Sequence, residues 1–298
     1  MIWRYILCLV LLAPVPAYAE KLANQLFGTK DQPSQQDPMP IGSYGKGCAA
    51  GLVAMPENGP NWQVMRLSRH RNYGHPVLIS YLQDLAANAE RIGWKGIYIG
   101  DMGQPRGGPM TSGHASHQIG LDVDIWALPP ARLDLTVKQR ENLSSISIRS
   151  ADQRSVNGNW NASYTAFLKA AASDPRVDRI FVAAAIKLEM CKTATRADKK
   201  WLQHIRPEAG HDDHFHIRLK CPKGATLCET QKPTVTDLSN GGDGCDETLD
   251  YWVSEAYLNP KPVAKKPKSA DDPPRKRRAR EFTMADLPRQ CADVLSSE

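Results

Sequence analysis

Apolar positions in the middle of the chain recur first with helical spacing and then with the spacing of strands. From Val77 to Ile92 they fall on one helical face, and Gly93 provides a stop. Beyond it the pattern predicts a strand at 96–99, followed by a glycine-rich loop at 103–113. Further on it predicts a helix at 163–172, a buried strand at 179–183 and a second helix at 184–190. Residues 20–60 show little periodicity and are expected to be irregular, anchored at Cys48.

Two short segments alternate strictly between apolar and polar residues, which predicts half-buried strands. The first has Leu121, Val123 and Ile125 on one side and Asp122, Asp124 and Trp126 on the other. The second has Phe215, Ile217 and Leu219 opposite His214, His216 and Arg218. If the two strands pair antiparallel, Asp124 and His216 approach each other across the ladder, and His117 enters from the preceding loop.

These elements predict an α+β fold, in which a small antiparallel sheet carries the polar residues and is flanked by helices and long disulfide-tied loops. Hydrophobic residues make up 41% of the 298 positions and charged residues 23%, which excludes a coiled coil, a collagen-like chain and a wholly disordered protein. No internal repeat is visible, and nothing past Tyr251 indicates a second core. A single domain over residues 20–258 is therefore expected.

The first nineteen residues have the pattern of a secretory signal peptide. Arg4 precedes an apolar run from Tyr5 to Val15, and Ala17-Tyr18-Ala19 matches a cleavage site of the A-x-A kind. The alternative is a transmembrane anchor, which needs about 20 apolar residues, more than this run has. The pattern therefore predicts export, with cleavage after residue 19 and no later transmembrane segment.

Six cysteines lie beyond the signal segment, and an even number in an exported chain favours disulfides. They are Cys48, Cys191, Cys221, Cys228, Cys245 and Cys291. Spacing alone indicates only that Cys221 and Cys228 can close a small loop. A thiolate metal site is the alternative, but the chain has no CxxC pair.

Most of the net positive charge is concentrated in one segment near the C-terminus. Residues 260–280 contain nine Lys or Arg, two Asp and five Pro. Such a segment cannot bury a core, so 259–281 is predicted to be an extended linker, with 282–298 tied back to the body through Cys291. The linker either attracts an anionic polymer or membrane surface or is a solvated spacer. Nucleic acid is a poor partner for an exported chain without a recognition fold.

Five of the eight histidines fall in two short segments that also carry aspartates. Imidazole and carboxylate groups are ligands for Zn²⁺, and a catalytic zinc takes three protein ligands and leaves a fourth position open. Strand histidines are often surface residues and strand aspartates are often solvated, but the two segments together favour a metal site. Its expected members are His114, His117, Asp124 and His216.

The sequence favours metal-activated water as the nucleophile, because it has no HExxH or GxSxG motif and its cysteines are expected to be oxidised. His214 lies two residues from His216 on the same strand face and is the candidate proton carrier. His211 and Asp213 are the alternatives. Asp122 either holds a ligand imidazole or pairs with Arg218.

The spacing of His117 and Asp124 and the triplet from His214 to His216 match the H-x(6)-D and H-x-H motifs of the metallopeptidases that include lysostaphin-type enzymes, D-Ala-D-Ala dipeptidases and the hedgehog fold. The longer stretches SGHASHQIGLDVDIW, HDDHFHIRL and RLSRHRNYGHP, together with the six cysteines and the signal, resemble the penicillin-insensitive murein endopeptidase family over nearly all of the mature chain. The resemblance implies a periplasmic zinc peptidase that cuts D-alanyl to meso-diaminopimelyl cross-links between peptidoglycan stem peptides and is not stopped by β-lactams.

On the matching positions the resemblance implies His117, Asp124 and His216 as ligands, His114 as a further metal-site residue, and His214 and His211 as catalytic helpers. It also implies the nested disulfides Cys48–Cys291, Cys191–Cys245 and Cys221–Cys228. Some members of the family carry a second metal ion after the catalytic strand; here Asp152 is present in that region but no histidine follows it there, so a second ion is not claimed. Nothing in the family explains the basic insert before Cys291.

Arg66, Arg69, His70 and Arg71 form a basic cluster that either holds the carboxylates of a peptide substrate or is a solvated face. Arg106 is a weaker candidate of the same kind. Two other functions stay open: a D,D-carboxypeptidase or dipeptidase with one side of its cleft closed, and a non-catalytic zinc-stabilised cell-wall binding protein. Glycosidase activity fits poorly, because the aspartates lie among histidines.

Overall fold

A computed structural model describes residues 20–262 and 275–297. The predicted signal segment and most of the predicted basic linker lie outside these described residues. No helix in the described ranges is long and apolar enough to cross a membrane.

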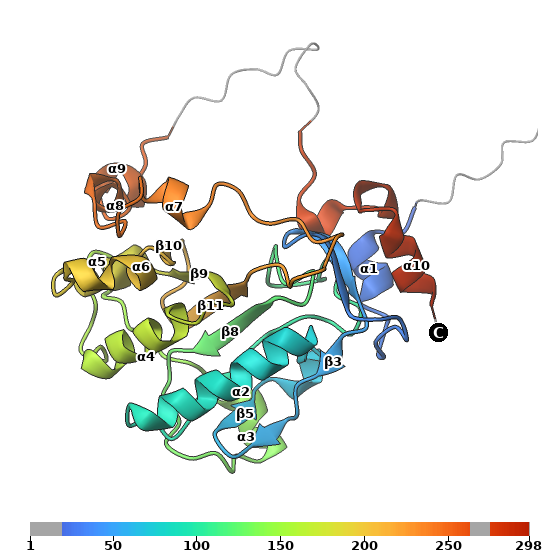
Figure 1. Cartoon of the computed structure of the whole chain (residues 1–298), viewed down its shortest axis with the longest axis horizontal. Helices are drawn as coiled ribbons and strands as arrows, with labels where there is room; N and C mark the ends of the chain where they lie inside the picture. The colour runs from blue at the N-terminus through green and yellow to red at the C-terminus, as the bar shows by residue number, and fades with distance from the viewer. Residues whose placement is uncertain (1–19, 263–274, 298) are drawn as a thin grey trace, which may run out of the picture.

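The centre of the fold is a mixed sheet of seven strands (Figure 1). Its order is β10 (Ile205–Pro207), β9 (Val177–Val182), β11 (His214–Leu219), β8 (Asp122–Trp126), β7 (Ile97–Ile99), β5 (Trp62–Val64) and β4 (Asn58–Gly59). The pairs β9–β11, β11–β8 and β8–β7 are antiparallel, whereas β10–β9 and β5–β7 are parallel. The α+β class is confirmed, and the sheet extends further than the predicted strands.

Helix α2 (Pro76–Arg91) forms because its ends are well defined and one face is apolar. His75 is extended at the N-cap, where its Nδ1 accepts a hydrogen bond from the Val77 N–H at 3.1 Å, and a proline occupies the first turn. Its buried side chains face α4 (Ala162–Ala172) and the sheet. The predicted helix is confirmed to within one residue at either end.

The main core fills the space between the sheet and helices α2 and α4, which Figure 1 shows along the same side of the sheet. The inward residues of the two central strands belong to it: Leu121, Val123, Ile125, Phe215, Ile217 and Leu219. Period-two alternation therefore sends the polar residues of the same strands to the opposite face, where the sheet carries Asp122, Asp124, His216 and Arg218.

A second, smaller core corrects two of the sequence-based expectations. Residues 20–60 are not irregular throughout, since α1 (Ala23–Phe27) and the hairpin of β1 (Met39–Ser43) and β2 (Lys46–Ala50) lie in this region. They pack against α10 (Gln290–Ser296), so apolar packing continues past Tyr251; Figure 1 shows α1 beside α10. Glycines and a proline in the hairpin hide its alternation, and at Gly47 a Cβ would lie only 2.2 Å from the Ile41 carbonyl oxygen.

Three disulfides tie the long loops to these cores. They join Cys48 to Cys291, Cys191 to Cys245 and Cys221 to Cys228. This is the nested pairing that the family resemblance implies, and it removes these thiols as metal ligands.

The remaining elements surround the sheet and connect its strands. The short strands are β3 (Val53–Ala54) and β6 (Tyr73–Gly74), and the helices of the main body are α3 (Val137–Asn142), α5 (Ala184–Cys191) and α6 (Lys199–Leu202). Later in the chain follow α7 (Val235–Leu238), α8 (Glu247–Tyr251) and α9 (Glu255–Leu258). Single 3₁₀ turns cover Leu67–Arg69, Arg196–Asp198, Ala279–Glu281 and Met284–Asp286.

Candidate metal centre and active site

The antiparallel pairing of β8 and β11 forms the floor of the site. His216 lies directly opposite Asp124, and Arg218 lies opposite Asp122. Because the two strands are in this register and share one polar face, the side chains of His216 and Asp124 meet: His216 Nδ1 is 3.4 Å from Asp124 Oδ1. This is the approach that the alternating pattern predicts.

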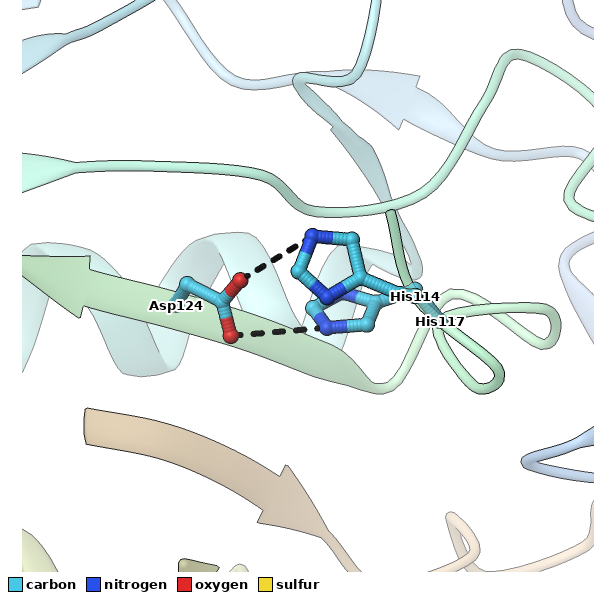
Figure 2. Close-up of side chains that lie close together, drawn as sticks. All are labelled: His114, His117 and Asp124. Atoms are coloured by element: carbon cyan, nitrogen blue, oxygen red, sulfur yellow. Dashed lines mark ion pairs between the residues drawn. The ribbon is translucent and has the colours of Figure 1, made fainter. Parts of the chain in front are cut away.

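The loop before β8 brings two further histidines to Asp124 (Figure 2). His117 adopts a left-handed backbone conformation, φ 65°, and its N–H donates to Asp122 Oδ2 at 2.9 Å. Its Nδ1 lies 3.1 Å from the Met102 carbonyl oxygen and donates to it, which leaves Nε2 directed at Asp124 Oδ1 at 3.4 Å. His114 Nε2 lies 3.4 Å from the other oxygen of the same carboxylate.

The residues present fit a metal ion on two observations. One ligand atom each from His114, His117 and Asp124 lie within 4.8 Å of one another. His117 Nε2, Asp124 Oδ1 and His216 Nε2 are also buried without a hydrogen-bond partner in the described part of the chain. Buried polar atoms are rarely left unpaired, and two or three imidazoles with a carboxylate form a donor set typical of Zn²⁺.

Electrostatics favour the metal-binding forms of Asp124 and His216, whereas the carboxylates around His117, Asp124 first, outweigh its burial and raise its pKa. Burial by itself would raise the pKa of Asp124, but His117, His214 and His114 together outweigh burial, and the pKa lies well below its ordinary value. Burial lowers the pKa of His216 to about 4, so its ring is neutral at neutral pH. A carboxylate and a neutral imidazole are the forms that bind a metal.

Asp122 takes one of the two roles that the sequence left open, the pairing with Arg218, and it also accepts from the backbone of His117. Its carboxylate accepts hydrogen bonds from Arg218 Nε at 2.7 Å and Nη2 at 3.1 Å, and also from the His117 backbone. His216 Nε2 is 3.3 Å away, without the alignment of a hydrogen bond. Burial raises the pKa of Asp122, but Arg218 and His216 together lower it by more than burial raises it, so the carboxyl group is ionised. As a carboxylate it joins β11, through Arg218, to the loop that carries His117.

Asp101 belongs to the site although the sequence analysis did not single it out. It follows β7, and its nearly buried carboxylate lies 3.0 Å from His114 Nε2. It also accepts hydrogen bonds from Arg69 at 3.1 Å and Arg71 at 2.9 Å. The available signal was its place directly after a buried strand that ends at the same edge as the metal segment.

His214 lies at the rim of the metal cluster, oriented by a neighbouring carboxylate. Its Nδ1 is 2.7 Å from Asp213 Oδ1, and its Nε2 is 3.9 Å from Asp124 Oδ1. Donation from Nδ1 to Asp213 leaves Nε2 facing the cluster. The ring of His211 lies 4.9 Å from that of His214, and its Nδ1 is 2.8 Å from the Ala209 carbonyl oxygen.

Three adjoining hollows meet at His114. The first has a volume of about 410 Å³ and is lined by Arg66, Arg69, Trp126, Ser144 and His214, among others. The second, about 500 Å³, lies toward His211, His216, Phe181, Glu208 and Gln231. The third, about 370 Å³, lies between residues 113–115 and 278–281. The metal cluster therefore faces an open groove that continues on more than one side.

The predicted basic residues divide into groove residues and structural residues. Arg66 and Arg69 line the first hollow. Arg71 is directed inward, where it donates to Asp101 and to the carbonyl and hydroxyl oxygens of Ser112. The expectation for Arg106 is wrong: this side chain is buried and donates to carbonyl oxygens near the C-terminus, those of Val294, Leu295 and Ser297.

The fold and the site define the class of protein: it is an α+β protein with a candidate metal centre of histidines and aspartates in an open groove. A family model described as penicillin-insensitive murein endopeptidase matches residues 40–296. The chain belongs to this family of peptidases.

Similar proteins carry the same description. A penicillin-insensitive murein endopeptidase of Haemophilus influenzae is 41% identical over 235 residues, which cover 79% of each chain. One of Klebsiella pneumoniae subsp. pneumoniae is 37% identical over 260 residues, covering 87% of this chain and 90% of the relative. One of Salmonella typhi is 39% identical over 235 residues, covering 78% and 82%.

Proposed function

We propose that the protein is a periplasmic zinc endopeptidase that hydrolyses the D-alanyl to meso-diaminopimelyl cross-links of peptidoglycan. The observation that carries the proposal is the cluster of His114, His117 and Asp124 beside an open groove, in which one ligand atom of each residue lies within 4.8 Å of the others. His216 adjoins this cluster, with Nδ1 3.4 Å from Asp124 Oδ1. Family membership and the names of the relatives support the substrate class. The signal pattern of residues 1–19 supports the location.

His117, Asp124 and His216 would hold the ion, with His114 as a further metal-site residue. A bound Zn²⁺ supplies Lewis acidity, which lowers the pKa of water from 15.7 to roughly 7 and polarises a peptide carbonyl. The Met102 carbonyl oxygen accepts from His117 Nδ1 and leaves its Nε2 free. Asp101 holds the His114 ring through Nε2, the same nitrogen that faces Asp124. These contacts hold both rings beside Asp124 before an ion binds.

Proton transfer is assigned to His214. Its Nε2 faces the cluster at 3.9 Å from Asp124 Oδ1, while Asp213 holds Nδ1. In this position the ring takes a proton from the nucleophile and returns it to the leaving amine. His211 lies beside it at the next hollow and supports its position.

The groove favours an endopeptidase over a carboxypeptidase. A carboxypeptidase closes one side of its cleft around a free terminal carboxylate. Here separate hollows lie on the Arg66 and Phe181 sides of the metal cluster. A chain that continues past the scissile bond in both directions therefore has space, and Arg66 and Arg69 can bind carboxylates on one arm.

The test is a muropeptide mass profile of sacculi incubated with the purified protein, with and without a chelator and with added penicillin. We expect cross-linked dimers to be replaced by monomers, with loss of this activity in the chelator, recovery with Zn²⁺ and no effect of penicillin. Release of terminal D-alanine without loss of dimers would replace the proposal with a carboxypeptidase.

A variant separates catalysis from metal binding. His214→Ala should retain Zn²⁺ and lose about 10²- to 10⁴-fold in turnover, the usual contribution of a positioned acid–base group. His204→Ala is the matched control, because this histidine contacts the Asp178 carbonyl oxygen and lies outside the groove. If the protein binds zinc and sacculi but neither it nor His214→Ala hydrolyses anything, it is a binding protein.

A further inference from the structure

The segment from Arg275 to Glu281 returns to the metal site from the far end of the chain. It passes the loop that carries His114, and Arg280 Nη2 donates to the Gly113 carbonyl oxygen at 2.9 Å. Between this segment and the loop lies the third hollow, lined by residues 113–115 and 278–281. Because His114 lines this hollow and the first one, a ligand over the metal site can extend into it.

The segment and the chain that follows it are fixed against the body, starting with Asn24 Nδ2, which donates to the Arg280 carbonyl oxygen at 3.4 Å. The Ala23 N–H donates to the Phe282 carbonyl oxygen at 2.7 Å, and Cys291 is bonded to Cys48. Arg106, from the loop that precedes His114, donates to three carbonyl oxygens at the end of α10. A wall held in this way is in place before any ligand binds, which lowers the entropic cost of binding.

The charge facing the third hollow is positive. Arg278 and Arg280 are exposed and line it. The one carboxylate of this wall, Glu281, accepts two hydrogen bonds from the Arg275 guanidinium and one from the Arg278 backbone N–H. Its charge is therefore balanced by Arg275, and guanidinium groups determine what the hollow attracts.

We propose that residues 278–281 form a wall of the substrate groove in which Arg278 and Arg280 bind carboxylate groups of the peptide being cleaved. This inference rests on the proposed function and adds a subsite to it. Arg66 and Arg69 line the first hollow, so carboxylates can be bound at two separate places beside His114. A cross-linked murein peptide meets this requirement, because both of its arms carry carboxylates.

The test measures KM and kcat on purified cross-linked muropeptide dimers in two forms, one with free carboxylates and one amidated. The double variant Arg278→Ala/Arg280→Ala should raise KM for the free form roughly tenfold, since each exposed ion pair contributes about a two- to fivefold effect. Its kcat and zinc content should equal those of the wild type. On the amidated dimers the two proteins should have the same KM.

The matched control is Arg289→Ala, which removes one charge from the same C-terminal part of the chain at an exposed position outside the hollow. It should leave both KM values unchanged. An equal rise of KM in this variant would reduce the effect to general electrostatic attraction and overturn the assignment.

Two other results would contradict the subsite. An unchanged KM in the double variant, with an active wild type, shows that the wall binds nothing. A fall in kcat and zinc content of the double variant at constant KM would show that Arg280 only holds the His114 loop. The single variant Arg278→Ala separates this structural role from substrate binding, because it leaves the hydrogen bond from Arg280 to Gly113 in place. If the wild type hydrolyses neither dimer, the proposed function fails, and calorimetric binding of the free dimer to wild type and double variant still decides the subsite.

Discussion

At the scale of single residues, the site depends on which atom of each side chain remains free. His117 shows this clearly, because its backbone N–H and Nδ1 are both occupied and only Nε2 faces Asp124. The residue types were predictable from the sequence, since histidines and aspartates at these spacings are typical of a metal site. Their partners were not, because Met102 and Asp101 carry no pattern of their own.

Asp101 gives a prediction about metal affinity. Asp101→Asn keeps the size of the side chain but removes the charge that Arg69, Arg71 and His114 share. Zinc affinity and kcat/KM should each fall by about 10- to 100-fold, as for other residues that orient a metal ligand. Competition with a chromogenic chelator measures the affinity. Glu141→Gln, which contacts the same basic segment through Ser68 but no histidine, should change neither quantity.

His75 gives a prediction about stability and pH. Burial lowers its pKa below 6.5, and its neutral Nδ1 caps α2. Below pH 6.5 the unfolded chain binds a proton that the folded chain resists, so stability falls as the pH falls through this range. In His75→Asn the amide caps at every pH. Urea unfolding between pH 7.5 and 5.5 should show a larger fall in the free energy of unfolding for the wild type than for His75→Asn. Parallel curves would refute the assignment.

At the scale of elements, the two central strands were predictable and the edges of the sheet were not. Period-two alternation determines which face of β8 and β11 is buried, and the side chains of the buried faces occupy the core. The short strands β4, β5 and β10 have two or three residues each, too few to produce a pattern. Their pairing is decided by neighbours that are distant in sequence.

Helix α2 supports the sheet from the side opposite the site, and its packing is testable. Leu82 is fully buried in the main core. Leu82→Ala should reduce the free energy of unfolding by about 2–5 kcal/mol, because it leaves a cavity. Gln83→Ala, on the exposed face of the same helix, should stay within about 0.5 kcal/mol of the wild type. Guanidinium unfolding followed by circular dichroism measures both, and equal effects would contradict this packing.

At the scale of the whole molecule, the N-terminal and C-terminal segments form one unit beside the main core. Cys48–Cys291 spans 243 positions and lies within the small core that joins them. Sequence patterns did not reveal this unit, because each of its elements is too short to show a periodic pattern. Their apolar residues are buried only when the elements pack against one another.

The long disulfide should therefore contribute more to stability than the short one. Cys48→Ala/Cys291→Ala should lower the free energy of unfolding by about 2–5 kcal/mol, because it frees a long loop in the unfolded chain. Cys221→Ala/Cys228→Ala, which opens a span of only 7 positions, should have an effect smaller by about 2–3 kcal/mol. Urea unfolding of both double variants measures the difference, and equal losses would contradict the expectation.

The sequence alone determined the α+β class, the strands that carry the polar residues and the residue types of the metal centre. These features depend on local periodicity and on ligand chemistry, which the order of residues contains directly. The tertiary structure decided the rest. It turned Arg71 and Arg106 into structural residues, brought Asp101 to His114, and placed Arg278 and Arg280 beside a histidine more than 160 positions away. Such contacts depend on how distant segments pack, and no local pattern encodes them.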